Sequence, residues 1–258
     1  MINTRIIVVL LVNQELHLIK TIAFDRRTYL GDPLNAAFIF SGFEVDELLV
    51  LHIDATRNSD TIPISFVESL SRFTNVPLSV GGGIKDLDQI QHILSLGVEK
   101  IVLSSALNAN FGLLEAAVSR FGSSTISVII NTFITSNGSM FSCFGRPDMT
   151  NNYHPTIDLA SRCEQSGAGE LIFNSVDRDG SLCGFQSDLL ADLNSVLHIP
   201  LVGLGGCGSI DHISFAIGKA PLSGIAAGSL FVYAPGTSQV LLNYPPRILN
   251  RNNQLSFK

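Results

Sequence analysis

Several residue types that often reveal a protein's chemistry are scarce in this sequence of 258 residues. Tryptophan is absent, and only three methionines and four cysteines occur. The cysteines form no CxxC pair and have no histidine at zinc-site spacing; they are Cys143, Cys163, Cys183 and Cys207. We therefore expect no disulfide framework, no bound metal and no cofactor. Reduced thiols predict a cytoplasmic protein.

Positive charge is also in short supply. The chain carries 16 Lys and Arg residues against 22 Asp and Glu residues, which gives a net charge of −6, and these charges are scattered along the sequence. A nucleic-acid partner requires a basic surface that neutralises its phosphates, so we expect no such partner.

Long apolar runs are missing as well. The best candidate, residues 6–12, follows Arg5 and is far shorter than the roughly 20 residues that cross a bilayer. Asn13, Gln14 and Glu15 come next, without the small-residue cleavage site of a secretory signal. The run therefore predicts a buried strand, and we expect no membrane association.

Apolar residues are abundant overall. They make up 46% of the chain, its mean hydropathy is +0.34, and its length suits a single α/β barrel over residues 1–258. Eight short apolar runs predict strands at 6–12, 48–53, 78–80, 101–103, 126–130, 171–173, 201–202 and 224–227. The runs are continuous rather than alternating, as in a parallel sheet covered by helices. Segments 86–96 and 156–166 predict two such helices, and 135–154 predicts a long loop.

An internal repeat indicates how the strands are arranged. One ungapped shift of the sequence aligns DELLVLHIDAT at 46–56 with GELIFNSVDRD at 169–179, and PLSVGGGIKDLDQI at 77–90 with PLVGLGGCGSIDHI at 200–213. The same shift aligns SSAL at 104–107 with AGSL at 227–230. Two half-barrels of four strands produce such a repeat, whereas an open doubly wound sheet does not. The sequence therefore predicts a (β/α)8 TIM barrel with a twofold internal repeat.

The repeat places a glycine turn and small polar residues at matching strand ends in each half. The first set is Gly82 and Gly83 with Ser104 and Ser105, and the second is Gly205 and Gly206 with Gly228 and Ser229. A single glycine pair most often only permits a tight turn. Two copies at strand ends, where backbone amides of a barrel bind anions, predict a small-molecule ligand with a phosphate at each end.

A series of motifs then resembles one family over nearly the whole chain. The motifs are GDP at 31–33, DELLVL at 46–51, VGGGI at 80–84, GAGE at 167–170, DRDG at 177–180 and AAGSLF at 226–231. Their order and spacing resemble the cyclase subunit of imidazole glycerol phosphate synthase, a histidine-biosynthesis barrel. The resemblance implies that a glutaminase subunit delivers ammonia to the barrel floor, and that a bisphosphorylated nucleotide reacts at the opposite mouth. It also implies that Asp179 and Gly180 of DRDG serve a phosphate site.

The positions that carry catalysis in this family are altered. The resemblance implies an acid–base pair of aspartates near the ends of the first and fifth strands, where this chain has Leu11 and Asn131. Neither can transfer a proton near neutral pH. Lys20 matches the family's lysine after the first strand. His52 occupies the expected place of a carboxylate, and Asp54, two residues on, shares its face and could point inward. His52 could equally be a core histidine with its hydrogen bonds satisfied.

At the barrel floor, by contrast, the charged positions of the family are retained. The resemblance implies a gate for ammonia made of alternating charges, and the matching positions are Arg5, Glu47, Lys100 and Glu170. Singly, each could be a solvated charge, since surface ion pairs contribute only about 0–1 kcal/mol and the floor of a barrel mainly serves stability. A complete ring favours a gate.

Three functions remain open from the sequence. The first is a barrel that binds a bisphosphorylated ligand, forms a heterodimer with a glutaminase at its N-terminal face, and passes ammonia to a separate sugar amidotransferase. It resembles the branch of the family that supports sugar amidation in lipopolysaccharide or O-antigen synthesis, where leucine also replaces the first aspartate. The second is a working cyclase subunit of histidine biosynthesis. The third is a bisphosphate-binding barrel without catalysis.

Overall fold

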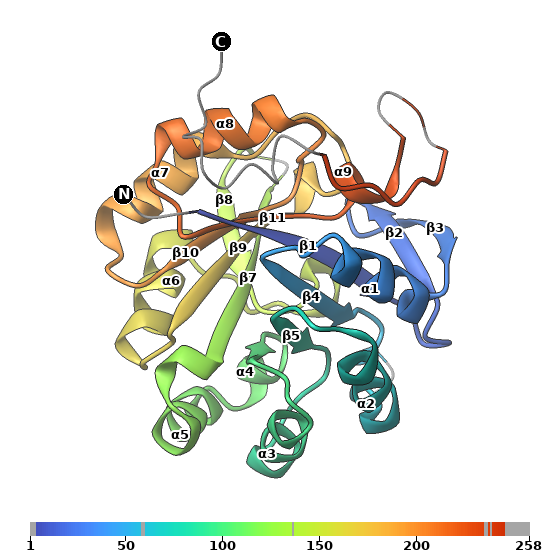
Figure 1. The fold of residues 1–258 in the computed structure, drawn as a ribbon. Helices are drawn as coiled ribbons and strands as arrows, with labels where there is room; N and C mark the ends of the chain where they lie inside the picture. Colours follow the sequence, from blue (N-terminus) through green and yellow to red (C-terminus); the bar gives the residue numbers. More distant parts are fainter. Residues whose placement is uncertain (1–3, 58–59, 136, 235–236, 238, 246–258) are drawn as a thin grey trace.

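The computed structural model describes residues 4–57, 60–135, 137–234, 237 and 239–245. Eight parallel strands form a closed ring in chain order, and the last of them pairs with the first (Figure 1). They are β1 (Arg5–Val12), β4 (Glu47–His52), β5 (Leu78–Gly81), β6 (Lys100–Leu103), β7 (Ile126–Ile134), β9 (Glu170–Ser175), β10 (Leu201–Leu204) and β11 (Gly224–Ala227). The predicted (β/α)8 barrel and its eight strands are confirmed.

The helices surround this ring on its outer side (Figure 1). They are α1 (Pro33–Gly42), α2 (Ile64–Phe73), α3 (Leu87–Ser95), α4 (Ala106–Ala109), α5 (Gly112–Phe121), α6 (Thr156–Gln165), α7 (Ser187–Val196), α8 (Ile210–Lys219) and α9 (Ser229–Val232). The helices predicted at 86–96 and 156–166 are confirmed as α3 and α6. Asp86 caps α3 by accepting from the backbone N–H of Gln89, which is why the helix begins there.

The strands are apolar on both faces because each face is buried. One face packs against the helices, with side chains such as Val8, Val50 and Ile130. The other fills the barrel interior, where Ile7, Leu49, Ile129, Ile172, Val202 and Ala226 form a second apolar cluster. A barrel interior is thus a packed core rather than an open pore.

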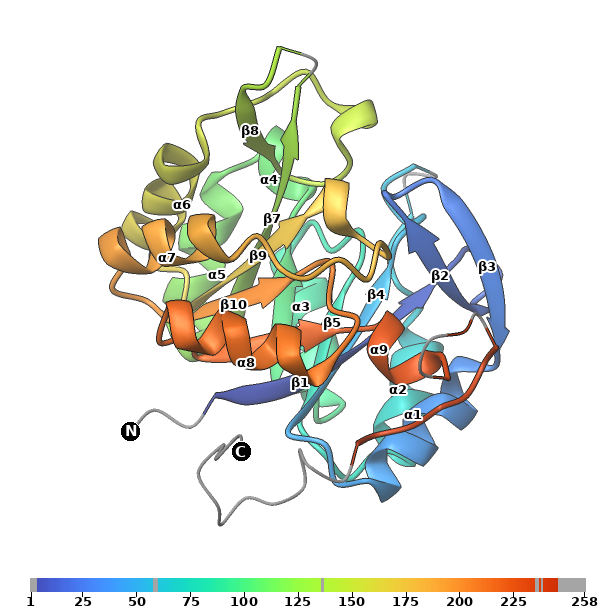
Figure 2. The same ribbon diagram turned by 90° about the horizontal axis from the view of Figure 1, so that it is seen from above.

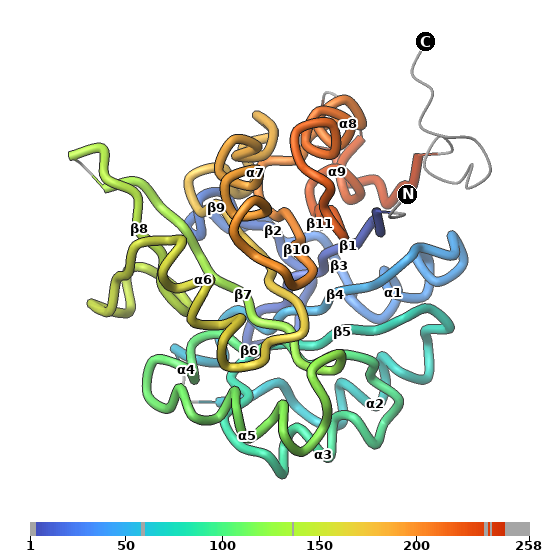
Figure 3. The backbone as a smooth tube through the Cα atoms, turned by 90° about the vertical axis from the view of Figure 1, so that its left-hand side faces the viewer, coloured from blue at the N-terminus to red at the C-terminus, as the bar shows by residue number. Residues whose placement is uncertain are grey.

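Two antiparallel hairpins depart from the simple barrel, and both stand beyond the carboxyl ends of the strands (Figure 2). β1 continues into β2 (Leu18–Ile22) and β3 (Arg26–Gly31), which pair with each other. β7 runs on to Ile134 and folds back as β8 (Met140–Cys143). In Figure 3 this second hairpin projects at the left, far from the N-terminal end of β1.

The prediction of a loop over residues 135–154 was therefore wrong in part. Thr135 and Ser139 close a tight turn through the backbone hydrogen bond from Thr135 N–H to the Ser139 carbonyl, and Gly138 supplies a φ of +83° within it. Met140–Cys143 then pairs with β7 as an antiparallel strand. The strand is only four residues long, and the Ser, Asn, Gly and Pro residues on either side of it indicated a loop.

Candidate functional site

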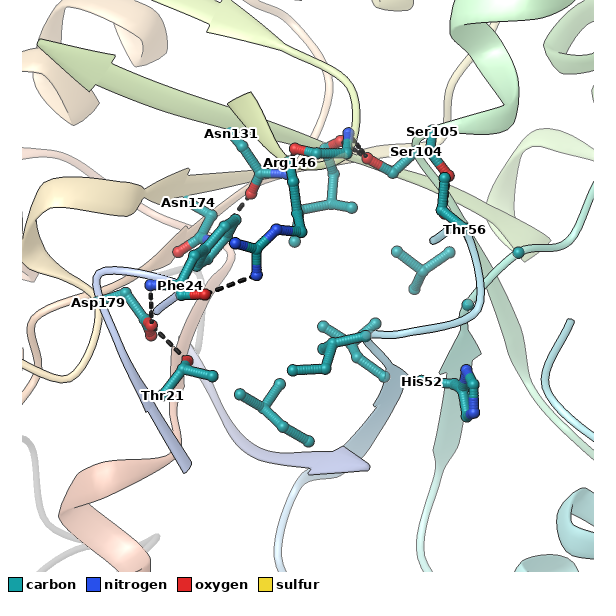
Figure 4. Close-up of a pocket in the computed structure, with 18 of the residues that line it drawn as sticks. Thr21, Phe24, His52, Thr56, Ser104, Ser105, Asn131, Arg146, Asn174 and Asp179 are labelled. Carbon is teal, nitrogen blue, oxygen red and sulfur yellow. Dashed lines mark hydrogen bonds between the residues drawn. The ribbon is translucent and has the colours of Figure 1, made fainter. Parts of the chain in front are cut away.

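A cavity opens at the carboxyl ends of the strands, between the two hairpins (Figure 4). Its base is apolar and is formed by Val9, Leu11, Val102, Ile129 and Leu204. Its walls carry the polar side chains and come from the loops after the strands. The mouth of a (β/α)8 barrel is where such proteins bind and convert their substrates.

The first predicted phosphate turn lines this cavity. Gly82 and Gly83 have φ values of +133° and +68°, and a Cβ atom at Gly83 would lie 2.2 Å from the Asp60 carbonyl oxygen, so only glycine fits. Ser105 shares a hydrogen bond of 2.6 Å with Thr56. These residues come from three different loops, and the fold brings their hydroxyls and amides to one wall.

The hydroxyl of Ser104 is already committed elsewhere. It donates to the Ile129 carbonyl at 2.9 Å and accepts from the Gly145 N–H at 2.8 Å. A hydroxyl has one hydrogen to donate. Ser104 therefore has only its backbone N–H to offer an anion, and Ser105 and Thr56 are the side-chain donors of this wall.

The second predicted turn lies beside the cavity rather than on its wall. None of the four residues of this set is among those that line it, although Gly205 and Gly206 adopt the expected positive φ values of +94° and +96°. The turn is linked to the mouth by Lys20, because a Cβ atom at Gly228 would lie 2.7 Å from the Lys20 ammonium nitrogen.

Lys20 is a buried cation on the wall of the cavity. Its residue is 6% exposed, and no hydrogen bond to its ammonium group is found among the residues described. Burial lowers the pKa of Lys20, and the nearby Asp179 carboxylate only partly opposes this effect. An anion bound at Gly228 and Ser229 would supply the partner that the ammonium lacks.

Asp179 lines the cavity but also holds the first hairpin in place. Its carboxylate accepts from the Thr21 hydroxyl at 2.5 Å and from the Phe24 N–H at 3.4 Å. Ala23 and Phe24 have φ values of +50° and +63°, a strained conformation for these residues, and the Ala23 N–H donates to the Asp179 carbonyl. Gly180 packs against the same hairpin, since a Cβ atom there would lie 2.2 Å from the Thr21 carbonyl oxygen.

The two positions of the family's acid–base pair both line the cavity. Leu11 contributes to its apolar base. Asn131 donates from Nδ2 to the Gly145 carbonyl at 2.6 Å, and its Oδ1 accepts from Asn174 at 2.9 Å. The Asn174 Oδ1 atom is buried and has no hydrogen-bond partner. The two amide side chains are thus hydrogen-bonded to each other, and the Asn174 Oδ1 atom remains free to accept a hydrogen bond from a ligand.

Asp54 is not among the described residues that line the cavity, and its carboxylate is paired with the first hairpin. Arg27 of β3 donates two hydrogen bonds to it, at 2.7 and 2.6 Å, and these lower the pKa of the Asp54 carboxyl. The pair ties the first hairpin to the end of β4. The described contacts of this carboxylate hold the fold together.

His52 lines the cavity and is buried, but it is not a satisfied core histidine. Its Nδ1 atom has no hydrogen-bond partner. Burial lowers the pKa of His52, against the opposing influence of Asp54 and Asp60. The imidazole is therefore held in its neutral form near neutral pH.

The floor of the barrel carries a closed ring of charge. Arg5 donates to Glu47 at 2.5 Å and also to Glu170, and Lys100 lies 3.3 Å from each of the same two carboxylates. Burial lowers the pKa of Arg5, but Glu170 and Glu47 together outweigh this and raise it. The four predicted gate residues do meet, directly below the apolar interior.

Two serines that the sequence did not single out support this ring. Ser79 donates to Glu47 at 2.6 Å and Ser127 donates to Glu170 at 3.2 Å. Both are about 1% exposed. Each glutamate of the ring is thereby fixed from the barrel interior as well as from the floor.

Other residues of the mouth were also missed. Thr56 could have been found, because the repeat aligns it with Asp179. Phe24, Arg146 and Asn174 carry no such signal, since their place in the site depends on hairpins and neighbouring strands. Among the residues described, no group of His, Cys, Asp and Glu could hold a metal ion. In the same part of the chain, no helix combines the length and apolar character needed to cross a membrane.

Comparison with known proteins identifies relatives of this chain. The family model described as "Histidine biosynthesis protein" matches residues 5–236. The "Putative imidazole glycerol phosphate synthase subunit HisF" of Leptospira borgpetersenii is 41% identical over 257 residues, which cover 95% of this chain and 96% of that protein. The "Putative imidazole glycerol phosphate synthase subunit hisF3" of Vibrio vulnificus is 38% identical, covering 95% and 94%. The "Imidazole glycerol phosphate synthase subunit HisF" of Lactococcus lactis subsp. cremoris strain SK11 is 31% identical over 85% of each chain.

The second glycine turn should be intolerant of a side chain. A Cβ atom at Gly206 would lie 2.1 Å from the Gly184 carbonyl oxygen, at a φ of +96°. We expect Gly206→Ala to lower the free energy of unfolding by at least about 2 kcal/mol, measured by urea denaturation. Gly218→Ala in α8, with nothing within 4 Å of the new atom, is the control and should be neutral or stabilising. Equal effects of both substitutions would contradict this account of the turn.

The lowered pKa of Lys20 should appear in the pH dependence of anion binding. Only the protonated amine attracts a phosphate, so affinity should fall as pH rises through the lowered pKa, below the ordinary lysine value of about 10.4. Calorimetric titration with a bisphosphorylated nucleotide at several pH values measures this. Lys20→Met should bind weakly without the alkaline decline, whereas Lys219→Met on α8 should behave as wild type. An alkaline decline that survives in Lys20→Met would assign it to another group.

Proposed function

The chain belongs to the histidine biosynthesis protein family, and from that premise we propose that it is the ammonia-receiving barrel of a glutamine-dependent amidotransferase. In this proposal a glutaminase binds the floor, a bisphosphorylated ligand binds the mouth, and the cyclisation reaction of the family has been lost. The ammonia then serves a sugar amidotransferase in surface polysaccharide synthesis.

One observation carries the proposal: the floor keeps all four gate charges in mutual contact while the mouth lacks the acid–base pair. A ring of buried ion pairs is a poor way to gain stability, because apolar residues of similar volume often serve as well or better. Its retention in full is therefore best explained by a task at the floor. Ammonia is small and neutral, and it suits an apolar interior closed by a polar gate.

The polar groups of the mouth support the loss of cyclisation. Leu11 has no ionisable group, and Asn131 is held by Gly145 and Asn174. Asp54 is paired with Arg27, and Asp179 accepts hydrogen bonds from the first hairpin. General acid–base groups contribute typically about 10²–10⁴-fold each. In this proposal the described carboxylates Asp54 and Asp179 keep these structural hydrogen bonds and do not replace the missing pair.

The partner would bind at the amino ends of the strands. Lys100 and its neighbour Glu99 lie there, next to the helix ends that surround the floor. A stable complex of this kind buries about 1,200–2,000 Å² in total. The charge ring would then face the exit of the glutaminase, which is the geometry that transfer of ammonia without release to solvent requires.

A second candidate is a working cyclase subunit that uses other groups. It is favoured by the positions of Lys20 and Asp179, which both line the mouth, and by the first phosphate turn, which is intact. The two candidates differ in whether turnover occurs with free ammonia.

We expect the charge ring to couple glutamine hydrolysis by the glutaminase to formation of the amidated product. Lys100→Ala or Glu170→Ala should leave glutaminase binding largely intact but raise the ratio of glutamate released to amidated product, because ammonia leaks or fails to enter. Free ammonia at high concentration should still support product formation in both variants. The ratio is measured in a mixture reconstituted with the candidate glutaminase. An unchanged ratio in both variants, or no complex on gel filtration at micromolar concentrations, would make the ring barrel scaffolding alone.

We also expect negligible cyclase turnover with ammonia as the nitrogen donor. With two proton-transfer groups missing, the rate should fall at least about 10⁴-fold below that of the Lactococcus lactis relative measured in parallel. The combined substitution Leu11→Asp and Asn131→Asp tests the same positions in this chain and should raise the rate. A wild-type rate within about tenfold of that double variant would favour the second candidate.

A further inference from the structure

Arg146 stands over the mouth without having been assigned any role. It follows β8 on the way to the short helix η2 (Pro147–Met149), and its guanidinium extends into the cavity (Figure 4). Among the described residues that line the cavity, Lys20 and Arg146 are the lysine and arginine side chains. The two cations belong to opposite halves of the mouth.

Each cation is connected to a different phosphate turn, Lys20 through its side chain and Arg146 through the backbone that precedes it. Lys20 lies against Gly228 of the second turn. Arg146 follows Gly145, whose N–H donates to Ser104 and whose Cα packs so closely that a Cβ atom would lie 2.9 Å from the Ser105 Cβ. The backbone that carries Arg146 is thus built onto the first turn.

The guanidinium is oriented but not saturated. It donates to Asp148 at 2.9 and 3.1 Å and to the Phe24 carbonyl at 2.6 Å, and it lies over the Phe24 ring. An arginine has five N–H donors. Three are used by these contacts, so two remain for an incoming group, and a partner carboxylate already holds the side chain in one orientation.

Asn131 holds the backbone from which Arg146 extends. Its Nδ2 donates to the Gly145 carbonyl at 2.6 Å, and its orientation is set because its Oδ1 accepts from Asn174. A carboxylate at this position could only accept, and it would face a carbonyl oxygen. An amide therefore makes a contact here that the ionised aspartate expected from the family cannot make.

We propose that Arg146 binds a phosphate group of the ligand in the mouth and that Asn131 positions it there. The proposal rests on the proposed function of the mouth and extends it by naming a second cation, besides Lys20, for the phosphates of the ligand. Two parallel N–H groups of an arginine fit two phosphate oxygens, and Asp148 keeps them in place without competing for them.

The test is calorimetric titration with the bisphosphorylated nucleotide substrate of imidazole glycerol phosphate synthase. Arg146→Gln should weaken binding about 10- to 100-fold, as expected for loss of hydrogen bonds to a charged group. Arg57→Gln is the matched control, because Arg57 lies 3.7 Å from the same Asp148 carboxylate but does not line the cavity. That variant should bind within about twofold of wild type. Equal affinities of Arg146→Gln and wild type would overturn the proposal, and failure of wild type to bind would instead overturn the proposed function.

The positioning role of Asn131 has its own signature in the pH profile. At pH 8 the carboxylate of Asn131→Asp cannot donate to Gly145, so binding should weaken; as pH falls towards 5 the protonated acid regains a donor and binding should recover relative to wild type. Asn131→Ala should be weakened at every pH. Expressing each affinity relative to wild type at the same pH removes the titration of the ligand's own phosphates. Wild-type affinity in both variants, or a loss in Asn131→Asp that does not depend on pH, would refute this role.

Discussion

Closure of the parallel sheet is the constraint on which every site in this protein depends. β11 pairs with β1, with Gly224 opposite Arg5 and Ala226 opposite Ile7. Since all eight strands of the ring are parallel, their amino ends meet at the floor and their carboxyl ends at the mouth. Arg5 and Glu170 are 165 positions apart in the sequence and become direct partners only through this closure.

Glycine at position 224 leaves room for the apolar interior next to the ring. A Cβ atom there would lie 3.0 Å from Val202 and 3.1 Å from Ile7. Burying four charges is costly, and removing one partner of a buried pair typically costs about 3–5 kcal/mol because the other is left uncompensated. Ser79 reduces this cost by donating to the Glu47 oxygen that the two cations leave free, and Ser127 adds a second donor to Glu170 Oε1. The floor is thus a fully connected polar layer beneath an apolar core.

The polar side chains of the mouth have a different role from those of the floor. Its charged and amide side chains mostly hold loops: Arg27 and Asp54 tie the first hairpin to β4, Asp179 holds the strained Phe24 turn, and Asn131 holds the Gly145 backbone. Proton transfer requires a group that can gain and lose a proton near neutral pH. A mouth in which these side chains hold loops, while the described Lys20 ammonium and Asn174 Oδ1 atom have no hydrogen-bond partner, is suited to binding and orientation, in agreement with the proposed function.

The sequence alone predicted the features that depend on neighbouring residues along the chain or on the internal repeat. The eight strands follow from continuous apolar runs, the turns at Gly82 and Gly206 from glycine's access to positive φ, and the twofold architecture from the repeat. The meeting of the four floor charges was predicted from the resemblance to the family, whose gate residues match these four positions. Only the tertiary structure decided that β8 pairs with β7, that Asp54 binds Arg27, and that Arg146 enters the mouth and donates to the Phe24 carbonyl. Each of these depends on a partner from a distant segment, and a side chain's chemical type does not specify which partner the fold will bring to it.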